Sequence, residues 1–540
     1  MNPAPASARL WWALAALPLA FLGLFFLWPV GSVLARGLAE GGDLGGALAV
    51  LARPRTMRAL GTTVALALAG TAGSLALGVP AAWALSRFSW RFSRGVRALV
   101  TVPFVLPTIV VAAAFSALFA RSGLLGSWGL DQSPVAIVLA LVFFNVSVVV
   151  RIVGGAWEAL SPRLADAART LGASRARAFW RVTMPALRPA IVSAAAVVML
   201  FCSTSFALVL VLGGSRVRTI ETEIYLQVNQ FLDLRAAAVL AVVQVAFVGV
   251  ALAVSARAGR GRAPVAVGGA RGPRGLERVG VAAALAPTLL LMALPLAALV
   301  ERSLRTADGH GFDHYAALFA QPARGVLPVP VWQAAVNSVV TALVATALAA
   351  AVGLVTAQLV AARTRRATAL EGVAMLPLGV SSVVVGLGLL LTLNRSVLGV
   401  DLRASWWLVP IAQAVVALPL MLRVLLPAAR AIDPRLRAAA ATLGASPWRV
   451  WWNVDARLLR SAAAGALVFA FAISLGEFGA TVFVARPDRP TLPTAIARLL
   501  SRPGIENVGM AFAAAVLLAL ITGGVMLLSD RLRTRVGAEL

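Results

Sequence analysis

The sequence contains no lysine, and this absence excludes several kinds of chemistry. All 48 residues counted as lysine or arginine are arginine. A phosphate-binding loop of the type G-x-x-x-x-G-K-[ST] needs its lysine, so the chain has no ATP site of this kind. Schiff-base and pyridoxal-phosphate chemistry need a lysine as well. A GC-rich genome explains the excess of arginine and alanine, and it leaves the chemical consequence unchanged.

Cysteine and histidine are also scarce. Cys202 is the one cysteine, which excludes an intramolecular disulfide and a cysteine-based metal cluster. The two histidines, His310 and His314, have the spacing of a metal pair on a helix, but Gly309 and Gly311 beside them indicate a loop. We therefore predict no metal site. We also predict no catalytic residues, because no arrangement of a nucleophile with its general base is recognisable.

Apolar residues make up 60% of the 540 residues, charged residues only 13%, and the mean hydropathy is +0.89. A soluble domain carries about 25% charged residues, so a soluble enzyme or a disordered chain is excluded. The composition predicts an all-α polytopic membrane protein. The formal net charge of +27 is explained by basic loops on one side of a membrane, and we predict no nucleic-acid partner.

Apolar runs bounded by arginine, glycine and proline predict about twelve transmembrane helices. With both termini placed in the cytoplasm, arginines are more frequent in the inner segments than in the outer loops, as the positive-inside rule requires. The predicted spans are residues 10–35, 57–86, 97–120, 134–158, 188–212, 236–256, 279–301, 333–362, 368–393, 405–428, 459–484 and 508–529.

An internal repeat divides the chain into two parts. Residues 161–174 read SPRLADAARTLGAS, residues 433–446 read DPRLRAAAATLGAS, and the same shift aligns Phe206 with Phe478. Six helices per repeat is an even number, so the two repeats lie parallel in the membrane. We predict two six-helix halves and a cytoplasmic Gly/Pro/Arg-rich linker between them, with boundaries at 1–256, 257–278 and 279–540.

The repeated segment has the signals of a helix, a bend and a second helix. Ser161 and Asp433 are N-cap residues, each followed by a proline at the first helical position. Gly172 and Gly444 are suited to ending these helices. Aromatic residues that follow leave a second interpretation open, in which the segments lie on lipid headgroups: Phe179, Trp180, Trp451 and Trp452.

The first of these segments resembles the EAA loop of ABC importer permeases. It contains Asp166-Ala167-Ala168, then Gly172, and it ends in an apolar-x-apolar-Pro pattern at Pro185. In that family the loop is a coupling helix that sits in a groove of the ATPase subunit.

The second segment departs from this pattern. Ala439, Ala440 and Gly444 remain, but Ala438 replaces the acidic residue and Arg457 replaces the proline. Coupling through the second half is therefore expected to be weaker or geometrically different.

The resemblance implies the fold of a type I importer permease in a fused form, in which one chain replaces a permease dimer. It implies three partners: an ABC ATPase subunit, expected in two copies, an extracytoplasmic substrate-binding protein, and the lipid bilayer of the inner or cytoplasmic membrane. ATP and magnesium would bind to the ATPase, so no cofactor is expected on this chain. Transport would occur by alternating access.

Two short runs bear on the substrate. Residues 476–481, GEFGAT, resemble a stretch of oxyanion and ferric-ion permeases, and residues 219–225, TIETEIY, are similar to the thiamine and thiamine-phosphate permeases. We predict transport of thiamine or its phosphates. Two alternatives stay open: a ferric-iron ABC permease, and a secondary carrier driven by an ion gradient, which would not need paired glycine-centred loops.

Candidate residues of the translocation path lie within the fifth and eleventh predicted spans, and we expect the path between the two halves near the membrane midplane. Glu477 attracts a cation in one interpretation. In the other, its carboxylate is capped by backbone groups or paired with an arginine. The hydroxyl residues either contact substrate or form hydrogen bonds between helices. The candidates are Ser203, Thr204, Ser205, Glu477 and Phe478.

Three further candidates follow the fifth predicted span, in an outer loop. Glu221, Glu223 and Tyr225 are predicted to form an external gate or a contact with the binding protein. The alternative is a solvated loop surface without a special role.

Overall fold

The computed structural model describes most of the chain, and all structural statements concern this part. The predicted linker falls largely outside it, since residues 259–270 are not described. The described residues are 5–39, 44–101, 103, 106–258, 271–306, 309–320, 326–361, 364–393, 401–402, 405–502 and 504–538.

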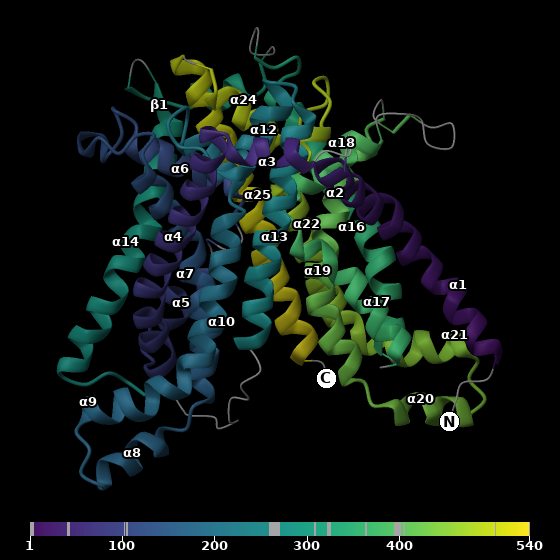
Figure 1. Cartoon of the computed structure of the whole chain (residues 1–540). Helices are drawn as coiled ribbons and strands as arrows, with labels where there is room; N and C mark the ends of the chain where they lie inside the picture. The colour runs from purple at the N-terminus through teal and green to yellow at the C-terminus, as the bar shows by residue number, and fades with distance from the viewer. Residues whose placement is uncertain are drawn as a thin grey trace. The chain divides into compact units, whose positions relative to one another are not determined.

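The chain forms two compact units (Figure 1). The first-half unit consists of Asp43–His314 and Pro503–Val516. The second-half unit consists of Met1–Gly42, Tyr315–Arg502 and Leu517–Leu540.

The described residues of the first-half unit form helices, one isolated bridge and one short hairpin, in which β1 (Arg305–Thr306) pairs antiparallel with β2 (Gly309–His310). Its helices, including turns labelled η, are α3 (Leu44–Ala52), α4 (Pro54–Arg87), α5 (Ser93–Thr101), α6 (Thr108–Phe119), η3 (Gly126–Trp128), α7 (Pro134–Ala159), α8 (Pro162–Thr170), α9 (Arg175–Ala178), η4 (Phe179–Thr183), α10 (Met184–Ser203), α11 (Phe206–Leu212), α12 (Ile220–Asn229), α13 (Leu234–Ala258) and α14 (Leu276–Leu304).

The second-half unit is built from helices alone within its described residues. Its elements are α1 (Pro5–Leu22), η1 (Gly23–Leu27), α2 (Trp28–Ala39), α16 (Val331–Ala361), α17 (Arg365–Met375), η5 (Leu376–Gly379), α18 (Ser382–Thr392), α19 (Leu408–Ala431), α20 (Pro434–Thr442), α21 (Pro447–Val450), η6 (Trp451–Ala456), α22 (Arg457–Gly476), α23 (Thr481–Val484) and α24 (Leu492–Leu500). Two helices contribute residues to both units: α15 (Asp313–Ala317) and α25 (Ile505–Ala538).

The compact units differ from the sequence halves by an exchange of their first helices. Helices α1 and α2 come first in the sequence, yet α1 packs on α16 and α2 packs on α18 in the second-half unit. Helix α14 opens the second sequence half, yet it packs on α4 and α6 in the first-half unit. The predicted boundaries therefore describe the sequence repeat, whereas folding contacts group the helices differently.

Ten described helices are long and apolar enough to cross a membrane, and the bent pair 365–379 and 382–392 brings the number to eleven. This pair, the predicted ninth span, bends by 100°. The bend follows Pro377, and the Ser381 hydroxyl accepts a hydrogen bond from the Val384 N–H to begin α18. The predicted third span is likewise divided, into α5 and the 12-residue α6, whose N-cap is Pro107.

The predicted fifth and eleventh spans are wrong in their extent. Each was drawn as one helix, 188–212 and 459–484, but the helices end at Ser203 and Gly476. A short helix follows each break, α11 and α23 respectively. At their other ends these helices begin earlier than predicted, because a π-helical turn joins each to the polar segment before it.

Small residues allow the spanning helices to pack closely. In the first-half unit α4 lies against α7, and a Cβ added to Gly78 would lie 2.6 Å from the Cβ of Val149. Thr63 and Ser74 of α4 are buried and return their hydroxyl hydrogen bonds to carbonyls of the same helix. Close contact of small residues, rather than burial of bulky ones, is how helices associate in lipid.

Candidate coupling segments and translocation site

The two repeated segments begin and end their first helices in nearly the same way. We call residues 161–185 the first coupling segment and 433–457 the second. Pro162 and Pro434 occupy the first helical position of α8 and α20. Asp433 Oδ1 accepts a hydrogen bond of 2.9 Å from the Arg435 N–H, whereas Ser161 caps α8 without a side-chain hydrogen bond.

Both helices end at the predicted glycines. Gly172 has φ +85° and Gly444 has φ +79°, a left-handed conformation that favours glycine. In the first segment the Gly172 N–H donates to Arg169 O and the Ala173 N–H donates to Ala168 O, both at 3.0 Å. The second segment repeats this pair of bonds, with the Ala445 N–H donating to Ala440 O at 3.1 Å. These are Schellman ends, so the prediction of a glycine bend is confirmed.

The helix after each bend is part of a membrane span. The Ser174 hydroxyl accepts a hydrogen bond from the Arg177 N–H at 3.2 Å, and Ser446 and Arg449 form the corresponding contact at 3.5 Å. From there the helical path continues through η4 or η6 into the span, over 175–203 and 448–476. Each coupling segment is therefore one short helix, a bend, and the extended foot of a spanning helix.

Exposed leucines occupy matching positions in the two segments. Leu171 is 88% exposed and Leu443 87%, each directly before its glycine. Leu164 and Leu436, two helical turns earlier, are 49% and 48% exposed. Sequence reasoning missed these leucines, although the repeat itself places apolar residues at the same two positions of otherwise polar helices.

The coupling segments lie at one end of their units. In Figure 1 α8 and α9 are at the end of the first-half unit opposite to α12, and α20 and α21 are at the end of the second-half unit opposite to α24. An exposed apolar stripe on a projecting helix is the form that fits a groove in a partner protein.

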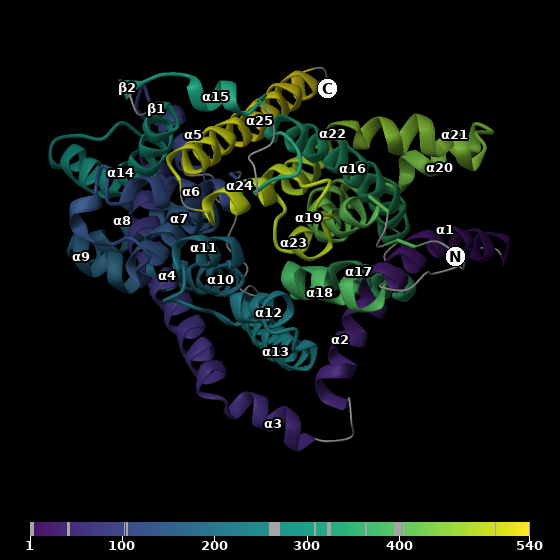
Figure 2. The same cartoon turned by 90° about the horizontal axis from the view of Figure 1, so that it is seen from above.

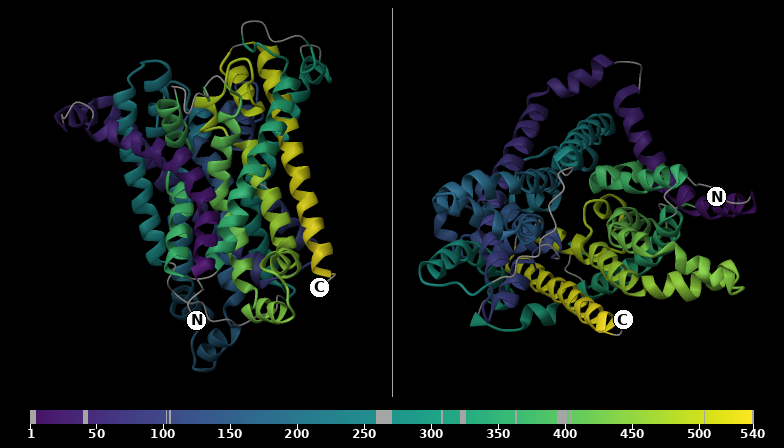
Figure 3. Two further views of the ribbon diagram at one scale, coloured as in Figure 1. Left: turned by 90° about the vertical axis from the view of Figure 1, so that its right-hand side faces the viewer. Right: turned by 90° about the horizontal axis from the view of Figure 1, so that it is seen from below.

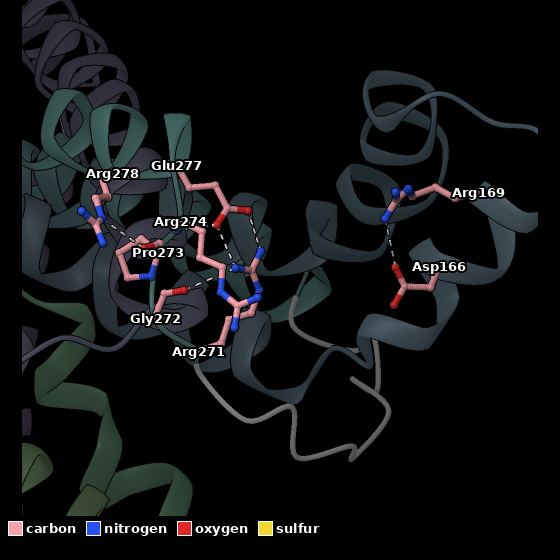
Figure 4. Close-up of polar contacts among 8 residues, drawn as sticks. All are labelled: Asp166, Arg169, Arg271, Gly272, Pro273, Arg274, Glu277 and Arg278. Carbon is pink, nitrogen blue, oxygen red and sulfur yellow. Dashed lines mark hydrogen bonds and ion pairs between the residues drawn. The ribbon is translucent and has the colours of Figure 1, made fainter.

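The predicted residues of the first coupling segment take different parts in this structure. Asp166 is exposed and lies 3.5 Å from Arg169 on the same helix (Figure 4). Ala167 and Ala168 supply carbonyls to the helix end, as Ala439 and Ala440 do in the second segment. Pro185 lies in the first turn of α10. Of the five predicted residues of this segment, one is therefore an exposed acid, and the other four contribute to the path of the backbone.

An ion pair at the start of α14 lies on the same side of the first-half unit as the first coupling segment. Arg271 donates two hydrogen bonds to the Glu277 carboxylate, at 2.8 and 2.5 Å, and Glu277 also accepts from the Arg274 N–H (Figure 4). The backbone of Arg271 pairs with Phe88 between α4 and α5, so the entry to α14 is fastened to this unit.

The hydroxyl residues of the predicted path lie at the break after α10. The hydroxyls of Ser203 and Thr204 donate to Leu200 O at 2.8 and 3.0 Å, and that of Ser205 donates to Phe201 O at 2.7 Å. These hydrogen bonds return to carbonyls in the last turn of α10, where the Thr204 N–H also donates to Leu200 O at 3.2 Å. They do not join neighbouring helices, as one interpretation proposed.

Glu477 lies at the matching break after α22, and it is 6% exposed. Its carboxylate accepts hydrogen bonds from the Ala480 N–H at 2.7 Å, the Thr481 N–H at 2.9 Å and the Thr481 hydroxyl at 2.5 Å. Glu477 therefore caps the start of α23, in agreement with the backbone-capped interpretation. Phe478 beside it is buried. A Cβ at position 479 would collide with the Ser382 hydroxyl, which explains the glycine there.

Glu221 and Glu223 are buried in α12, each 1% exposed. Glu223 Oε1 lies 2.6 Å from Arg55 Nε and accepts a hydrogen bond of 2.9 Å from Gln227. The alternative of a solvated loop surface therefore does not describe these two residues, while their role as an external gate or a contact with the binding protein stays a prediction. Tyr225 is partly buried, with its ring 5.5 Å from that of Phe206.

One side chain that sequence reasoning missed connects two of the predicted sites. The Gln244 amide donates to Ser203 O at 3.2 Å and to Glu221 Oε1 at 3.4 Å. Gln244 belongs to α13, which lies beside α12 (Figure 2). The end of α10 and the acidic face of α12 are thus parts of one buried polar network. In the sequence, the signal that could have indicated this network is a glutamine within an apolar span.

A cavity of about 330 Å³ opens in the second-half unit beside the start of α16 and α19. Its lining includes Trp406, Arg486 and Arg489. Arg486 donates two hydrogen bonds of 2.9 Å to Asp488 and lowers the pKa of that carboxyl. An aromatic ring with guanidinium groups suits a ligand that combines a ring with an anion.

Comparison with known proteins identifies the family. The model of the binding-protein-dependent transport system inner membrane component matches the chain twice, over residues 74–259 and 349–538. The thiamine transport system permease protein ThiP of Escherichia coli (strain K12) is 31% identical over 417 residues, which cover 73% of this chain and 74% of ThiP.

Shorter relatives match about a third of the chain. The molybdenum transport system permease protein ModB of Escherichia coli (strain K12) is 35% identical over 195 residues, 34% of this chain and 85% of ModB. The alignment with the structure of a bacterial ABC transporter involved in the import of the acidic polysaccharide alginate covers 47% of this chain and 96% of that chain, at 17% identity and a TM-score of 0.39.

The chain belongs to the binding-protein-dependent inner membrane components, as a type I ABC importer permease with both halves fused in one polypeptide.

Proposed function

We propose that this permease imports thiamine or its phosphates. The match to ThiP over most of both chains supports this substrate, and so does the run at 219–225. The cavity with Trp406 and two arginines has a chemistry suited to an aromatic cargo that carries phosphate.

Energy would come from a separate ABC ATPase, present in two copies and holding ATP and magnesium. The observation that carries this proposal is the matched pair of projecting helices, each with an exposed leucine beside a Schellman end. Each would fit a groove of one ATPase subunit through α8 or α20. No cofactor of this chain itself enters the cycle.

Transport follows from differential binding. A partner shifts a conformational equilibrium only if it binds one state more tightly than the other. An ATPase dimer that closes on ATP would draw the two coupling segments together, because its two grooves hold one segment each. The spanning helices that continue from them, α10 and α22, would then carry this movement to the breaks at Ser203 and Gly476.

The membrane orientation is part of the proposal. Within the second-half unit, α1 begins and α25 ends at the end that carries α20 (Figure 3). A cytoplasmic ATPase on α20 therefore requires both termini in the cytoplasm. A binding protein outside the membrane would deliver substrate to the opposite end of each unit, where α12 and α24 lie.

The ModB relatives favour a second candidate cargo, a molybdenum oxyanion. They match about a third of the chain, whereas ThiP matches 73% of it, so thiamine is the first proposal. Ferric iron is a further arm of the same test.

The test is uptake by proteoliposomes that contain the permease, its ATPase and its binding protein. We expect ATP-dependent accumulation of thiamine or thiamine diphosphate and none of molybdate or ferric ion. Accumulation by the permease without the ATPase would show a secondary carrier, and uptake of molybdate or iron alone would replace the substrate.

Variants of the exposed leucines test the coupling surface. Burial of a leucine is worth about 1.5–3 kcal/mol, so Leu171→Asp should weaken ATPase binding about tenfold or more. Leu232→Asp is the matched control, because Leu232 is 77% exposed but follows α12 at the other end of the unit. Equal binding of the ATPase by both variants would contradict this surface.

A further inference from the structure

The second coupling segment lacks the acidic residue of the first, yet an ion pair fastens its helix. Arg437 of α20 donates from Nε to Asp455 Oδ1 at 2.8 Å, and a second guanidinium nitrogen of Arg437 lies 2.6 Å from the same oxygen. Asp455 belongs to η6 and is 4% exposed, while the Arg437 side chain is 30% exposed. The pair joins the projecting helix to the foot of the span.

The first coupling segment has no corresponding pair. Alignment of the repeats places Ala165 opposite Arg437 and Thr183 opposite Asp455. The one ion pair recorded within residues 161–185, Asp166 with Arg169, lies within a single turn of α8 and does not reach η4. Within the described residues of the two segments, an ion pair between the first helix and the start of the span therefore occurs in the second segment alone.

Because Asp455 is buried, its ion pair with Arg437 holds α20 against η6 more strongly than an exposed ion pair would. Exposed ion pairs contribute little, since water screens them and both side chains lose freedom. A carboxylate shielded from water depends on its partner, because loss of the arginine would leave a buried charge uncompensated. The two guanidinium nitrogens on one oxygen also fix orientation better than a single contact. Separation of α20 from η6 is consequently opposed.

We propose that Arg437 and Asp455 are positioning residues that make α20 and α22 move as one body. The proposal rests on the proposed function, in which α20 receives movement from the ATPase. We call this ion pair the clamp. The second segment has no acidic residue at position 438 to contact the ATPase, yet it would still transmit the movement, because the clamp prevents α20 from rotating about Gly444. The first segment would instead rely on its exposed Asp166 for a contact with the partner.

The first measurement uses the full-length permease alone in nanodiscs. Spin labels at Thr442 of α20 and Leu458 of α22, in a Cys202→Ala background, report the distance between the two helices by pulsed electron paramagnetic resonance. We expect a narrow distribution for the parent and a broad one for Arg437→Ala and for Asp455→Asn. The exchange of charges, Arg437→Asp with Asp455→Arg, should narrow it again.

The matched control is Arg435→Ala, because Arg435 is an exposed arginine of the same helix with no recorded ion pair in the described residues. A narrow distribution in both single variants, or equal broadening in the control, would overturn the clamp. Asp455→Asn nearly keeps the shape of the side chain and provides the result if Arg437→Ala fails to fold.

The second measurement is substrate transported per ATP hydrolysed by the reconstituted complex. Arg437→Ala should lower this ratio about threefold or more, and the charge exchange should restore it. An unchanged ratio would overturn the role in coupling. If the parent complex transports no thiamine, the proposed substrate fails, whereas the distance measurement still decides whether the clamp exists.

Discussion

The two coupling segments share a backbone and differ in how they are held. Both end a nine-residue helix in a Schellman turn on a left-handed glycine, with a leucine nearly 90% exposed beside it. The first presents an exposed aspartate and has only an ion pair within one helix turn. The second has no acid at that position but is joined to its span by Arg437 and Asp455.

This difference separates the geometric requirement from the chemical one. Because the bend recurs with different neighbouring chemistry, the direction of the projecting helix and its exposed leucine are what both segments supply. The fastening can come from inside the chain or from the partner. The segments should therefore respond alike to a change of the bend and differently to a change of charge.

The largest expected effect comes from Gly172→Pro and Gly444→Pro. Proline fixes φ near −65° and has no N–H to donate, whereas both glycines have positive φ and donate to the helix end. Either variant should reduce substrate-stimulated ATPase activity of the complex to background. Alanine at the same positions should cost about 1 kcal/mol in stability and leave partial activity. Stimulation that survives in one proline variant only would break the symmetry between the segments.

An intermediate effect is expected at the two broken spans. Glu477→Gln removes one of the charged oxygens that accept from Ala480 and Thr481, so the free energy of unfolding should fall by about 1–3 kcal/mol. Ser205→Ala, at the matching position, removes only a hydroxyl that donates to Phe201 O in the last turn of α10, and should cost about 1 kcal/mol or less. Denaturation in detergent with a fluorescent probe measures both, and equal losses would contradict a special role of the glutamate cap.

The smallest effect on stability is expected from Asp166→Asn. Its pair with Arg169 is exposed and 3.5 Å long, so the unfolding free energy should change by less than about 0.5 kcal/mol. ATPase binding should nevertheless weaken, because the variant loses the charge that the first segment presents. The matched change Ala438→Asp restores an acid to the second segment and should strengthen binding. If neither variant changes ATPase binding, the acidic residue does not distinguish the two coupling segments.

Local chemistry allowed the coupling segments to be predicted from sequence. Proline after a capping residue starts a helix and glycine ends it, and both signals act within a few residues. The breaks at Ser203 and Gly476 were missed because hydropathy averages over a window and does not register the loss of one helical turn in an apolar run. The divided third and ninth spans did carry a local signal, in Pro107 and Pro377.

Burial of Glu221 and Glu223 was beyond sequence reasoning for a different reason. Arg55, which neutralises Glu223, lies far away in the sequence, and nothing near α12 indicates it. The same limit applies to Gln244 and to the clamp of the second segment, since each depends on which helices become neighbours. A role in translocation stays a prediction for all of the proposed path residues, Glu477 included.

The exchange of first helices has a consequence for synthesis of the protein. Helix α1 leaves the ribosome hundreds of residues before α16 and α18, the helices against which α1 and α2 pack. The newly made N-terminal span, in which η1 joins α1 to α2, must wait in lipid until its neighbours are translated, and the unit built around α4 is likewise incomplete until α14 arrives. Assembly is therefore interlocked, and two polypeptides cut at the linker would each need a helix that the other one carries.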